Sequence, residues 1–447
     1  MYKSHRERLL KTLADSKTAA IIPTANMQTR NHDCEFRFRP TSDFWYLTGF
    51  AEPGSVLILL PQGIADGEEG SGEVRSILFL RDRDPKMETW NGRRLGIERA
   101  PDTLDIDEAR SIDDLWEDLP GLLKGYERIM YRTGGDDARD LKVMELHRKL
   151  RGRARAGVMP PLELVDTGVI LHEQRLFKTE AEINVMRKAA AMTAEAHKQA
   201  MALCGPGKNE CEIEALIEYT FRRKGSTGPA YTSIVAGGNN ACILHYIENN
   251  TVMNDGELLL IDAGAESEFY ASDVTRTFPI NGKFNDEQRA IYEVVLEAQL
   301  ASIALAKPGV PHTSIHEASL KVLVRGMLKL GLLKGTEESV MEDESYRRFY
   351  MHGTSHWMGL DVHDCGAYTI EGKSRLLEPG MVFTVEPGLY IEADDETVEA
   401  RWRGIGVRIE DDILITKDGH ENLSKDIPKT VEDVEAACQA RALEAAL

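Results

Sequence analysis

Two stretches of the sequence follow one pattern, Asp255-Gly256-Glu257-Leu258-Leu259-Leu260-Ile261-Asp262-Ala263-Gly264 and Pro379-Gly380-Met381-Val382-Phe383-Thr384-Val385-Glu386-Pro387-Gly388. In each, a turn ending in Gly precedes five mostly apolar residues, a carboxylate, one small or cyclic residue and Gly. The pattern predicts a strand that ends in a buried acid, which is costly unless something pairs with the charge. Its repetition predicts two equivalent halves that present carboxylates to one shared cation site.

Length and composition indicate an ordinary globular protein of two domains. The chain has 447 residues, more than a single core usually holds. Its apolar content of 42% and charged content of 29% are typical of soluble domains. The formal net charge of -20 disfavours nucleic acid or an anionic membrane as a partner, because both require a basic face.

The cysteines and the N-terminus lead us to expect a cytoplasmic protein. The six cysteines form no CxxC pair, and their spacing suggests neither a disulfide framework nor a zinc cluster. Residues 1–8 run directly into a charged helical pattern without the apolar core of a signal peptide. No segment reaches the roughly 18 uninterrupted apolar residues of a membrane helix.

The N-terminal part, taken as residues 1–173, has an α/β pattern. Short apolar strands are predicted at 19–22, 56–60, 77–80 and 129–131. Leucine and valine recur at helical spacing over 9–13 and 141–146. Alternating strands and helices of this kind are typical of an α/β domain.

The second part, taken as residues 174–440, reads as an α+β domain with an internal pseudo-twofold repeat. Thr179 and Glu182 form a capping box that begins one long helix, and a comparable helix follows Asn285. Each half then has a Pro-Gly break, a second helix and a strand-rich segment. Units of about a hundred residues are too long for a solenoid repeat.

Two further acids and a histidine cluster accompany the acid-tipped strands. Asp273 lies in the alternating segment 271–277 and Glu410 in 407–413, so each strand is followed by another that carries an acid. His352, His356 and His363 lie between the halves. Four carboxylates and one imidazole are a ligand set for two divalent ions such as Mn²⁺, Co²⁺, Fe²⁺ or Zn²⁺. Two such ions offset four carboxylates and activate a bridging water for hydrolysis.

These motifs resemble those of a known family. Ile-Asp262-Ala-Gly, Ser-Asp273-Val-Thr-Arg-Thr, His-Gly-Thr-Ser-His356-Trp, Val-Glu386-Pro-Gly and Arg-Ile-Glu410-Asp are similar to the metal-ligand motifs of pita-bread metallopeptidases, in particular the bacterial Xaa-Pro aminopeptidase (aminopeptidase P) family. The resemblance spans nearly the whole chain. Segment 42–50 looks like the non-catalytic creatinase-type N-terminal domain of that family.

The resemblance implies roles for further residues, two metal ions, most often Mn²⁺, and a homotetramer built as a dimer of dimers. His245 and His363 would bind the substrate, although His245 also fits a packed core position. Residues expected to bind substrate or support the ligands are Tyr231, His352, Tyr390 and Arg408. For Tyr231, a position packed in the core is an equally open alternative. Trp90 and Arg155 resemble residues that a neighbouring subunit lends to the pocket; the Arg-rich pattern around Arg155 leaves its correspondence open to a neighbouring Arg.

The reaction that the resemblance implies is removal of the first residue from peptides with proline second. The hypothesis is attack by a metal-bridging hydroxide, with Glu386 moving the proton and His245 or His363 stabilising the oxyanion. The nearest alternative is prolidase, which cuts Xaa-Pro dipeptides. A methionine aminopeptidase is disfavoured by the large N-terminal domain, and a metal-free creatinase-like enzyme by the complete ligand set. A non-enzymatic binding protein on the same fold is the alternative from another class.

Overall fold

The chain forms two compact units, Met1–Arg175 and Leu176–Leu447. The computed structural model describes residues 1–61, 64–65, 68–69, 75–152 and 160–440. The division after Arg175 lies close to the boundary after residue 173 taken from the sequence. Among the described residues no helix is long and apolar enough to cross a membrane.

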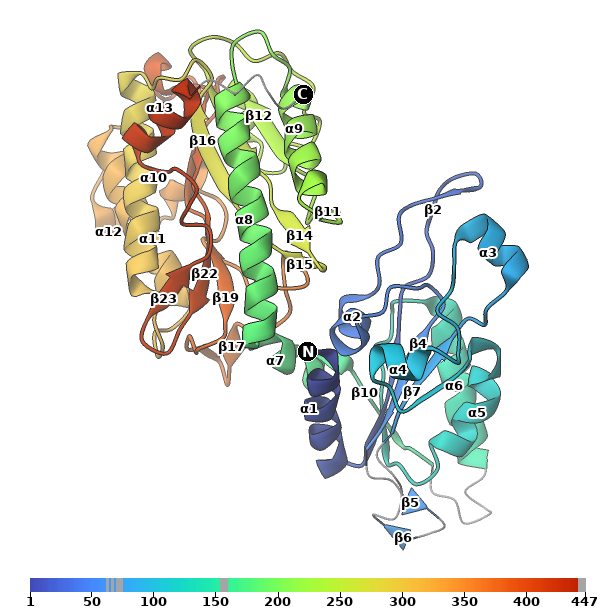
Figure 1. Cartoon of the computed structure of the whole chain (residues 1–447). Coiled ribbons are helices and arrows are strands. Elements are labelled where there is room, and N and C mark those ends of the chain that lie inside the picture. The colour runs from blue at the N-terminus through green and yellow to red at the C-terminus, as the bar shows by residue number, and fades with distance from the viewer. Residues whose placement is uncertain (62–63, 66–67, 70–74, 153–159, 441–447) are drawn as a thin grey trace. The chain divides into compact units, whose positions relative to one another are not determined.

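The N-terminal unit is built on a mixed six-stranded sheet with the strand order β10-β9-β1-β4-β7-β8 (Figure 1). Its strands are β1 (Thr18–Pro23), β4 (Val56–Leu60), β7 (Arg75–Leu80), β8 (Glu108–Ser111), β9 (Arg128–Met130) and β10 (Glu163–Val165). The four strands predicted at 19–22, 56–60, 77–80 and 129–131 are thereby confirmed as β1, β4, β7 and β9. Two short hairpins, β2 (Thr29–Asn31) with β3 (Cys34–Glu35) and β5 (Ile64–Ala65) with β6 (Glu68–Glu69), lie outside this sheet.

Helices cover both faces of that sheet. The helices are α1 (Tyr2–Asp15), α2 (Ser42–Thr48), α3 (Pro85–Asn91), α4 (Ala100–Leu104), α5 (Leu115–Leu122), α6 (Asp137–Gly152) and α7 (Leu171–Leu176), the last ending at the unit boundary. Side chains of α5 and α6 share one apolar core with alternate residues of β1 and β4, while α1 and α2 also contact β1 and β4. Because both faces are covered, β1, β4 and β7 are almost wholly buried, as the continuous apolar runs in the sequence indicate. The edge strands β8 and β10 are partly exposed.

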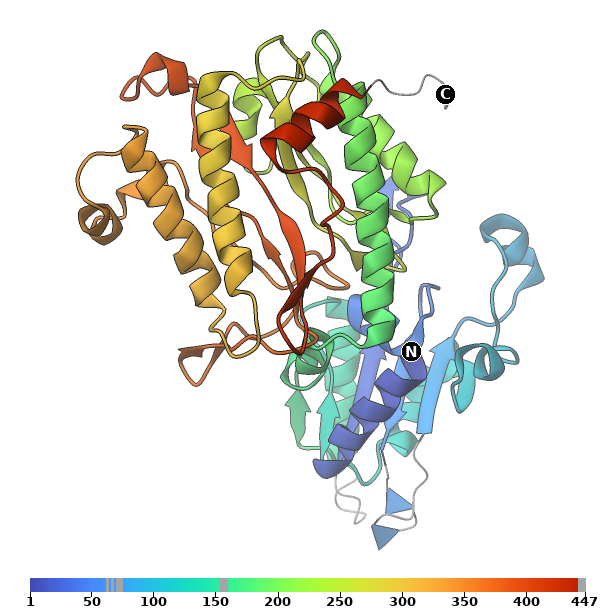
Figure 2. The same cartoon turned by 60° about the vertical axis from the view of Figure 1, so that its left-hand side comes forward.

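The described part of the C-terminal unit contains two pairs of long helices and two shorter helices. The helices are α8 (Glu180–Leu203), α9 (Glu210–Arg223), α10 (Asp286–Leu305), α11 (Thr313–Lys329), α12 (Glu337–Glu342) and α13 (Val431–Gln439). Helix α8 packs on α9, and α10 packs on α11. The Thr179 capping box is confirmed, and Asn285 begins α10 with a capping box of the same kind. In Figure 2 the long helices stand on one side of the strands.

The strands of the C-terminal unit form small antiparallel sheets. In the first half, β12 (Ile234–Gly237), β13 (Leu258–Asp262) and β16 (Thr275–Pro279) make one sheet, and β11 (Gly228–Pro229), β14 (Ala265–Ser267) and β15 (Tyr270–Ala271) make another. In the second half, β19 (Val382–Val385), β22 (Asp411–Ile415) and β23 (His420–Asn422) form one sheet, β20 (Gly388–Ile391) pairs β21 (Ile405–Arg408), and β17 (Thr369–Ile370) pairs β18 (Lys373–Ser374).

The predicted internal repeat is present in this unit. Each half has a helix pair followed by a strand that leads to an acid, β13 to Asp262 and β19 to Glu386. The second acids of the two halves are Asp273, which precedes β16, and Glu410, which precedes β22. Strand β13 pairs with β16, and β19 pairs with β22. The unit is an α+β domain with the expected pseudo-twofold repeat.

Candidate metal centre

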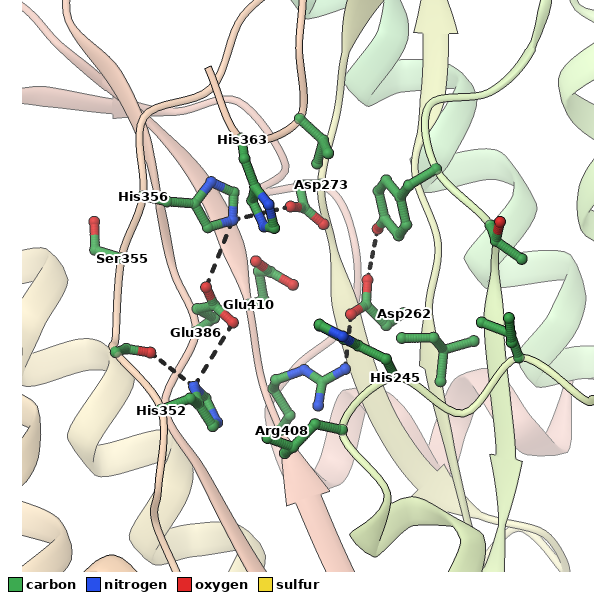
Figure 3. A pocket seen from close by; sticks show the side chains of 17 residues that line it. His245, Asp262, Asp273, His352, Ser355, His356, His363, Glu386, Arg408 and Glu410 are labelled. Atoms are coloured by element: carbon green, nitrogen blue, oxygen red, sulfur yellow. Dashed lines mark hydrogen bonds and ion pairs between the residues drawn. The ribbon is translucent and has the colours of Figure 1, made fainter. Parts of the chain in front are cut away.

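The five predicted ligands lie in one cavity of about 480 Å³ in the C-terminal unit (Figure 3). Asp262 is the last residue of β13, and Glu386 directly follows β19. The other three ligands are Asp273, His356 and Glu410. The sequence pattern places Asp273 and Glu410 within strands, which is wrong. Asp273 lies in the loop before β16, and Glu410 lies in the short connection between β21 and β22.

Both glycines of the repeated motif allow a close approach of another chain segment. A Cβ on Gly264 would lie 1.7 Å from the carbonyl oxygen of Ser272, the residue before Asp273. A Cβ on Gly388 would lie 2.4 Å from the Tyr390 hydroxyl. The glycine in Asp-Ala-Gly is therefore what lets the loop bearing the second acid pack against the strand bearing the first.

Three of the ligands form a compact cluster. One ligand atom each from Asp273, His356 and Glu410 lies within 4.8 Å of the others. His356 Nε2 is 3.3 Å from Asp273 Oδ2 and 3.6 Å from Glu386 Oε1, and Figure 3 shows these side chains converging. The Thr275 hydroxyl donates to Glu410 Oε2 at 2.6 Å. These distances leave room for cations between the side chains.

The electrostatics of the cluster favour the binding of cations. Burial and the neighbouring carboxylates raise the pKa of Glu386 to about 7. The same two causes raise the pKa of Glu410 well above its ordinary value. Burial lowers the pKa of His356, but the Asp273 and Glu386 carboxylates outweigh it and raise this pKa to about 9. Carboxylates this close repel one another unless cations lie among them, so the residues present fit two divalent ions.

One arginine connects the two halves beside the cluster. Arg408, the last residue of β21, donates from Nη2 to Asp262 Oδ2 at 2.7 Å. Its Nη1 donates to the Tyr390 hydroxyl at 3.1 Å, and its Nε donates to Thr275 Oγ1 at 3.1 Å. His352 Nε2 lies 2.7 Å from the same Tyr390 hydroxyl. Arg408, Tyr390 and His352 therefore form a chain of contacts that runs along the cavity from Asp262.

Two exposed histidines lie at the cavity opening. His245 follows the short helix Gly238–Cys242 and is exposed, so the structure rejects the core position that the sequence left open. His363 is also exposed, and its ring lies edge-on to His356 with centroids 4.4 Å apart. Burial lowers the pKa of His363, which leaves its imidazole neutral near pH 7 and able to donate or accept one hydrogen bond.

Tyr231 lies against the ligands rather than in the core. It is half-buried, and its hydroxyl donates to Asp262 Oδ1 at 2.6 Å. Asp262 thus receives one hydrogen bond from each half, from Tyr231 and from Arg408. Burial and the nearby carboxylates raise the Tyr231 pKa well above its usual value, so the hydroxyl keeps its proton.

The structure describes one of the two residues expected from a neighbouring subunit. Trp90 is on α3 of the N-terminal unit, with 79% of its surface exposed. Arg155 lies outside the described residues.

Sequence reasoning missed the apolar part of the cavity and two hydroxyls. Further lining residues are Thr232, Ile234, Leu244, Ile247, Val362 and Ser355. Ser355 stands inside the quoted His-Gly-Thr-Ser-His motif, and Leu244 and Val362 directly precede the two exposed histidines. Adjacency to a predicted site residue was the signal for these three. The same signal was available for Thr232, which directly follows Tyr231. Ile234 and Ile247 carry no comparable signal, because apolar lining residues look like core residues in a sequence.

Comparison with known proteins places the chain in a family. Residues 184–417 match the model of metallopeptidase family M24, and residues 2–131 match the N-terminal domain of aminopeptidase P. The chain therefore belongs to metallopeptidase family M24, and it is a hydrolase.

Within that family its relatives are aminopeptidases. The chain is 44% identical to Xaa-Pro aminopeptidase of Escherichia coli strain K12, with 97% of this chain and 96% of the relative covered. It is 45% identical to the Haemophilus influenzae Xaa-Pro aminopeptidase over 91% of this chain and 90% of that one. The structure matches Pseudomonas aeruginosa aminopeptidase PepP with a TM-score of 0.93, 47% identity and 99% of both chains covered. The resemblance drawn from the motifs is confirmed.

Proposed function

We propose that this protein is a dimetal aminopeptidase that releases the first residue from peptides whose second residue is proline. The observation that carries the proposal is the convergence of Asp262, Asp273, His356, Glu386 and Glu410 in one cavity. Its full-length similarity to Xaa-Pro aminopeptidases supports the choice of substrate. The cavity is also large enough to take a short peptide end beside the ligands.

Asp262, Asp273, His356, Glu386 and Glu410 would hold the two cations, with Mn²⁺ as the ion to test first. When bound, two such ions polarise the scissile carbonyl and lower the pKa of a water molecule. The Xaa-Pro bond has no N–H, so recognition has to come from the amino terminus and the carbonyl rather than from the backbone N–H of proline.

Substrate binding, proton transfer and stabilisation of the carbonyl oxygen fall to different side chains of the site. Asp262 and the surrounding acids attract the positively charged α-amine, which restricts cleavage to the terminal residue. Glu386 accepts the proton of the attacking water and delivers it to the proline nitrogen. His245 and His363, exposed at the cavity opening, donate hydrogen bonds to the carbonyl oxygen as negative charge develops on it.

Activity on a peptide series after chelation and metal add-back tests the proposal. We expect the chelated protein to be inactive and Mn²⁺ to restore cleavage of an Xaa-Pro-Xaa peptide, with only the first residue released. Preference for Gly-Pro over the longer peptide would instead identify a prolidase. A protein indifferent to Mn²⁺ and chelators would be a non-enzymatic binding protein, and the proposal would fail.

We infer in addition that the chain assembles as a homotetramer and that a neighbouring copy covers Trp90. An indole exposed over 79% of its surface is costly to leave in water, and aromatic residues of this kind are enriched at interfaces. Light scattering of the wild type and of Trp90→Ala tests this. A monomeric wild type, or an unchanged assembly and KM in the variant, would contradict the inference.

A further inference from the structure

Two neighbouring aspartates on β22 have opposite surroundings, although both are fully buried. Asp411 Oδ1 pairs with Arg276 Nη2 at 2.7 Å, and its Oδ2 also pairs with Lys429. Gln299, Asn422 and Ser424 donate further hydrogen bonds to it. Asp412 points to the other face of the strand, and among the described residues no Lys or Arg nitrogen lies within ion-pair distance of it.

The carboxylate of Asp412 instead contacts the loop that carries a predicted ligand. Asp412 Oδ1 accepts a hydrogen bond from the backbone N–H of Asp273 at 3.1 Å. Asp412 Oδ2 accepts one from the Ser272 hydroxyl at 2.8 Å. Asp412 belongs to the second half of the repeat and the loop to the first, so these bonds connect the halves.

Backbone hydrogen bonds hold both neighbours of Asp273, from Ser272 N–H to the Ala265 carbonyl at 3.0 Å and from Ala263 N–H to the Val274 carbonyl at 3.1 Å. The N–H of Asp273 itself is held by Asp412. Strand β15 ends at Ala271 and β16 begins at Thr275, which leaves Asp273 outside both strands. Its counterpart Glu410 is held by several groups of the first half. Glu410 N–H donates to the Thr275 carbonyl at 3.0 Å, and Arg276 Nη1 donates to the Glu410 carbonyl at 2.6 Å. Each second acid is thus fixed by residues of the opposite half.

We propose that Asp412 is a positioning residue that holds Asp273 in the orientation required for metal binding by accepting its N–H and the Ser272 hydroxyl. The inference rests on the proposed dimetal site. A buried carboxylate without a cation is costly, so Asp412 would not be kept here without a role. In other proteins, residues that hydrogen-bond to metal ligands orient those ligands and tune metal affinity. Asp411, one residue away, serves the packing of β22 against β16 and α10 through Arg276 and Gln299.

Metal titration of three variants tests this assignment. Chelated full-length protein is titrated with Mn²⁺ by calorimetry, and melting of the metal-free protein is followed in parallel. We expect Asp412→Ala to bind one of the two ions at least about tenfold more weakly. Asp412→Asn is expected to stay within about threefold of wild type. Its amide oxygen still accepts the Asp273 N–H, and its NH₂ donates to a reoriented Ser272 hydroxyl.

Asn422→Ala is the matched control. It removes a 2.8 Å hydrogen bond to the carboxylate of the neighbouring Asp411, on the other face of the strand. We expect it to lower the melting temperature and to leave both Mn²⁺ affinities within about threefold of wild type. A tenfold loss in this control would attribute the effect of Asp412→Ala to general destabilisation and would overturn the proposal.

The remaining outcomes are also decisive. The positioning role is overturned if Asp412→Ala binds Mn²⁺ as tightly as wild type, or if Asp412→Asn and Asp412→Ala lose equal affinity. In either case the proposed function stands as long as the wild type binds two ions. A wild type that binds no ion overturns both. If Asp412→Ala does not fold, Ser272→Ala replaces it. Binding of one ion about fivefold weaker is then expected, and binding within about threefold of wild type would contradict the role.

Discussion

Asp262 and Glu386 end matching strands in the two halves of the repeat, but their neighbours differ. Asp262 is neutralised by Arg408 at 2.7 Å and receives the Tyr231 hydroxyl at 2.6 Å. Glu386 has no arginine at this distance among the described residues. Its nearest basic atoms are His356 Nε2 at 3.6 Å and His352 Nδ1 at 4.0 Å.

The difference shows how one local motif gives two electrostatic environments. Burial raises the pKa of both carboxyl groups, and at Asp262 the Arg408 guanidinium is the largest opposing influence. At Glu386, which lacks an arginine partner, burial and the neighbouring carboxylates raise the pKa to about 7 in metal-free protein. The strand pattern alone does not distinguish the two residues, whereas the side chains packed around them do.

The largest effect is expected from Glu386→Gln. The amide cannot accept the proton of the attacking water, so kcat on an Xaa-Pro-Xaa peptide should fall about 10³-fold. Asp262→Asn is the same chemical change in the other half. It should reduce kcat by less than about 10²-fold and raise KM. Steady-state kinetics with metal analysis of both variants checks this. Near-normal turnover in a fully metallated Glu386→Gln protein would show that Glu386 does not move the proton.

Removal of the guanidinium that neutralises Asp262 should have the next largest effect. Arg408→Leu leaves a buried carboxylate without its cation, and the free energy of unfolding should fall by about 3 kcal/mol in metal-free protein. Arg187→Leu is the control, because Arg187 pairs with Glu421 at 2.7 Å at the surface and should cost less than about 1 kcal/mol. Urea denaturation measures both. Equal losses would mean that Asp262 does not depend on Arg408.

The raised pKa values predict a pH effect on metal-free protein. The carboxyl pKa of Glu386 rises from 4.5 to about 7 on folding, so the folded state holds a proton that the unfolded state releases. The raised His356 pKa acts in the same direction. The stability that these two groups contribute is therefore lost as pH rises from about 5 to 8, and it outweighs the opposite contribution of buried histidines such as His352, whose pKa is lowered. We expect the melting temperature of chelated protein to fall by about 3 °C or more over this range, and less with Mn²⁺ bound.

Calorimetric scans at several pH values, with and without Mn²⁺, provide the measurement. Glu386→Gln removes one of the titrating groups and should flatten the dependence in chelated protein. A melting temperature that rises with pH in the chelated wild type would contradict the predicted sign.

The smallest effect is expected from Tyr231→Phe, which deletes one hydrogen bond to Asp262 and leaves Arg408 in place. A lost hydrogen bond of this kind is worth about 1 kcal/mol, so Mn²⁺ affinity should weaken about fivefold. Calorimetric titration resolves such a change. Weakening as large as that of Asp262→Asn would mean that Tyr231, and not Arg408, is the main partner of Asp262.

Sequence reasoning performed well where the signal is local. The strands at 19–22 and 56–60 and the capping box at Thr179 are confirmed, because apolar runs and caps depend on adjacent residues. The same reasoning wrongly placed Asp273 and Glu410 within strands. Both stand just outside, since strand ends depend on pairing with distant segments. It also left His245 open between core and surface, which only packing resolves.

The sequence by itself determined the repeat, the set of five candidate ligands and the family to which the motifs belong. These follow from the order and spacing of residues along the chain. The tertiary structure decided which carboxylate Arg408 neutralises, which one keeps a pKa near 7, and which buried aspartate faces the loop of Asp273. The contacts of Arg408 with Asp262 and of Asp412 with Asp273 join residues more than a hundred positions apart. Their energies depend on burial and distance, which exist only once the two halves have packed together.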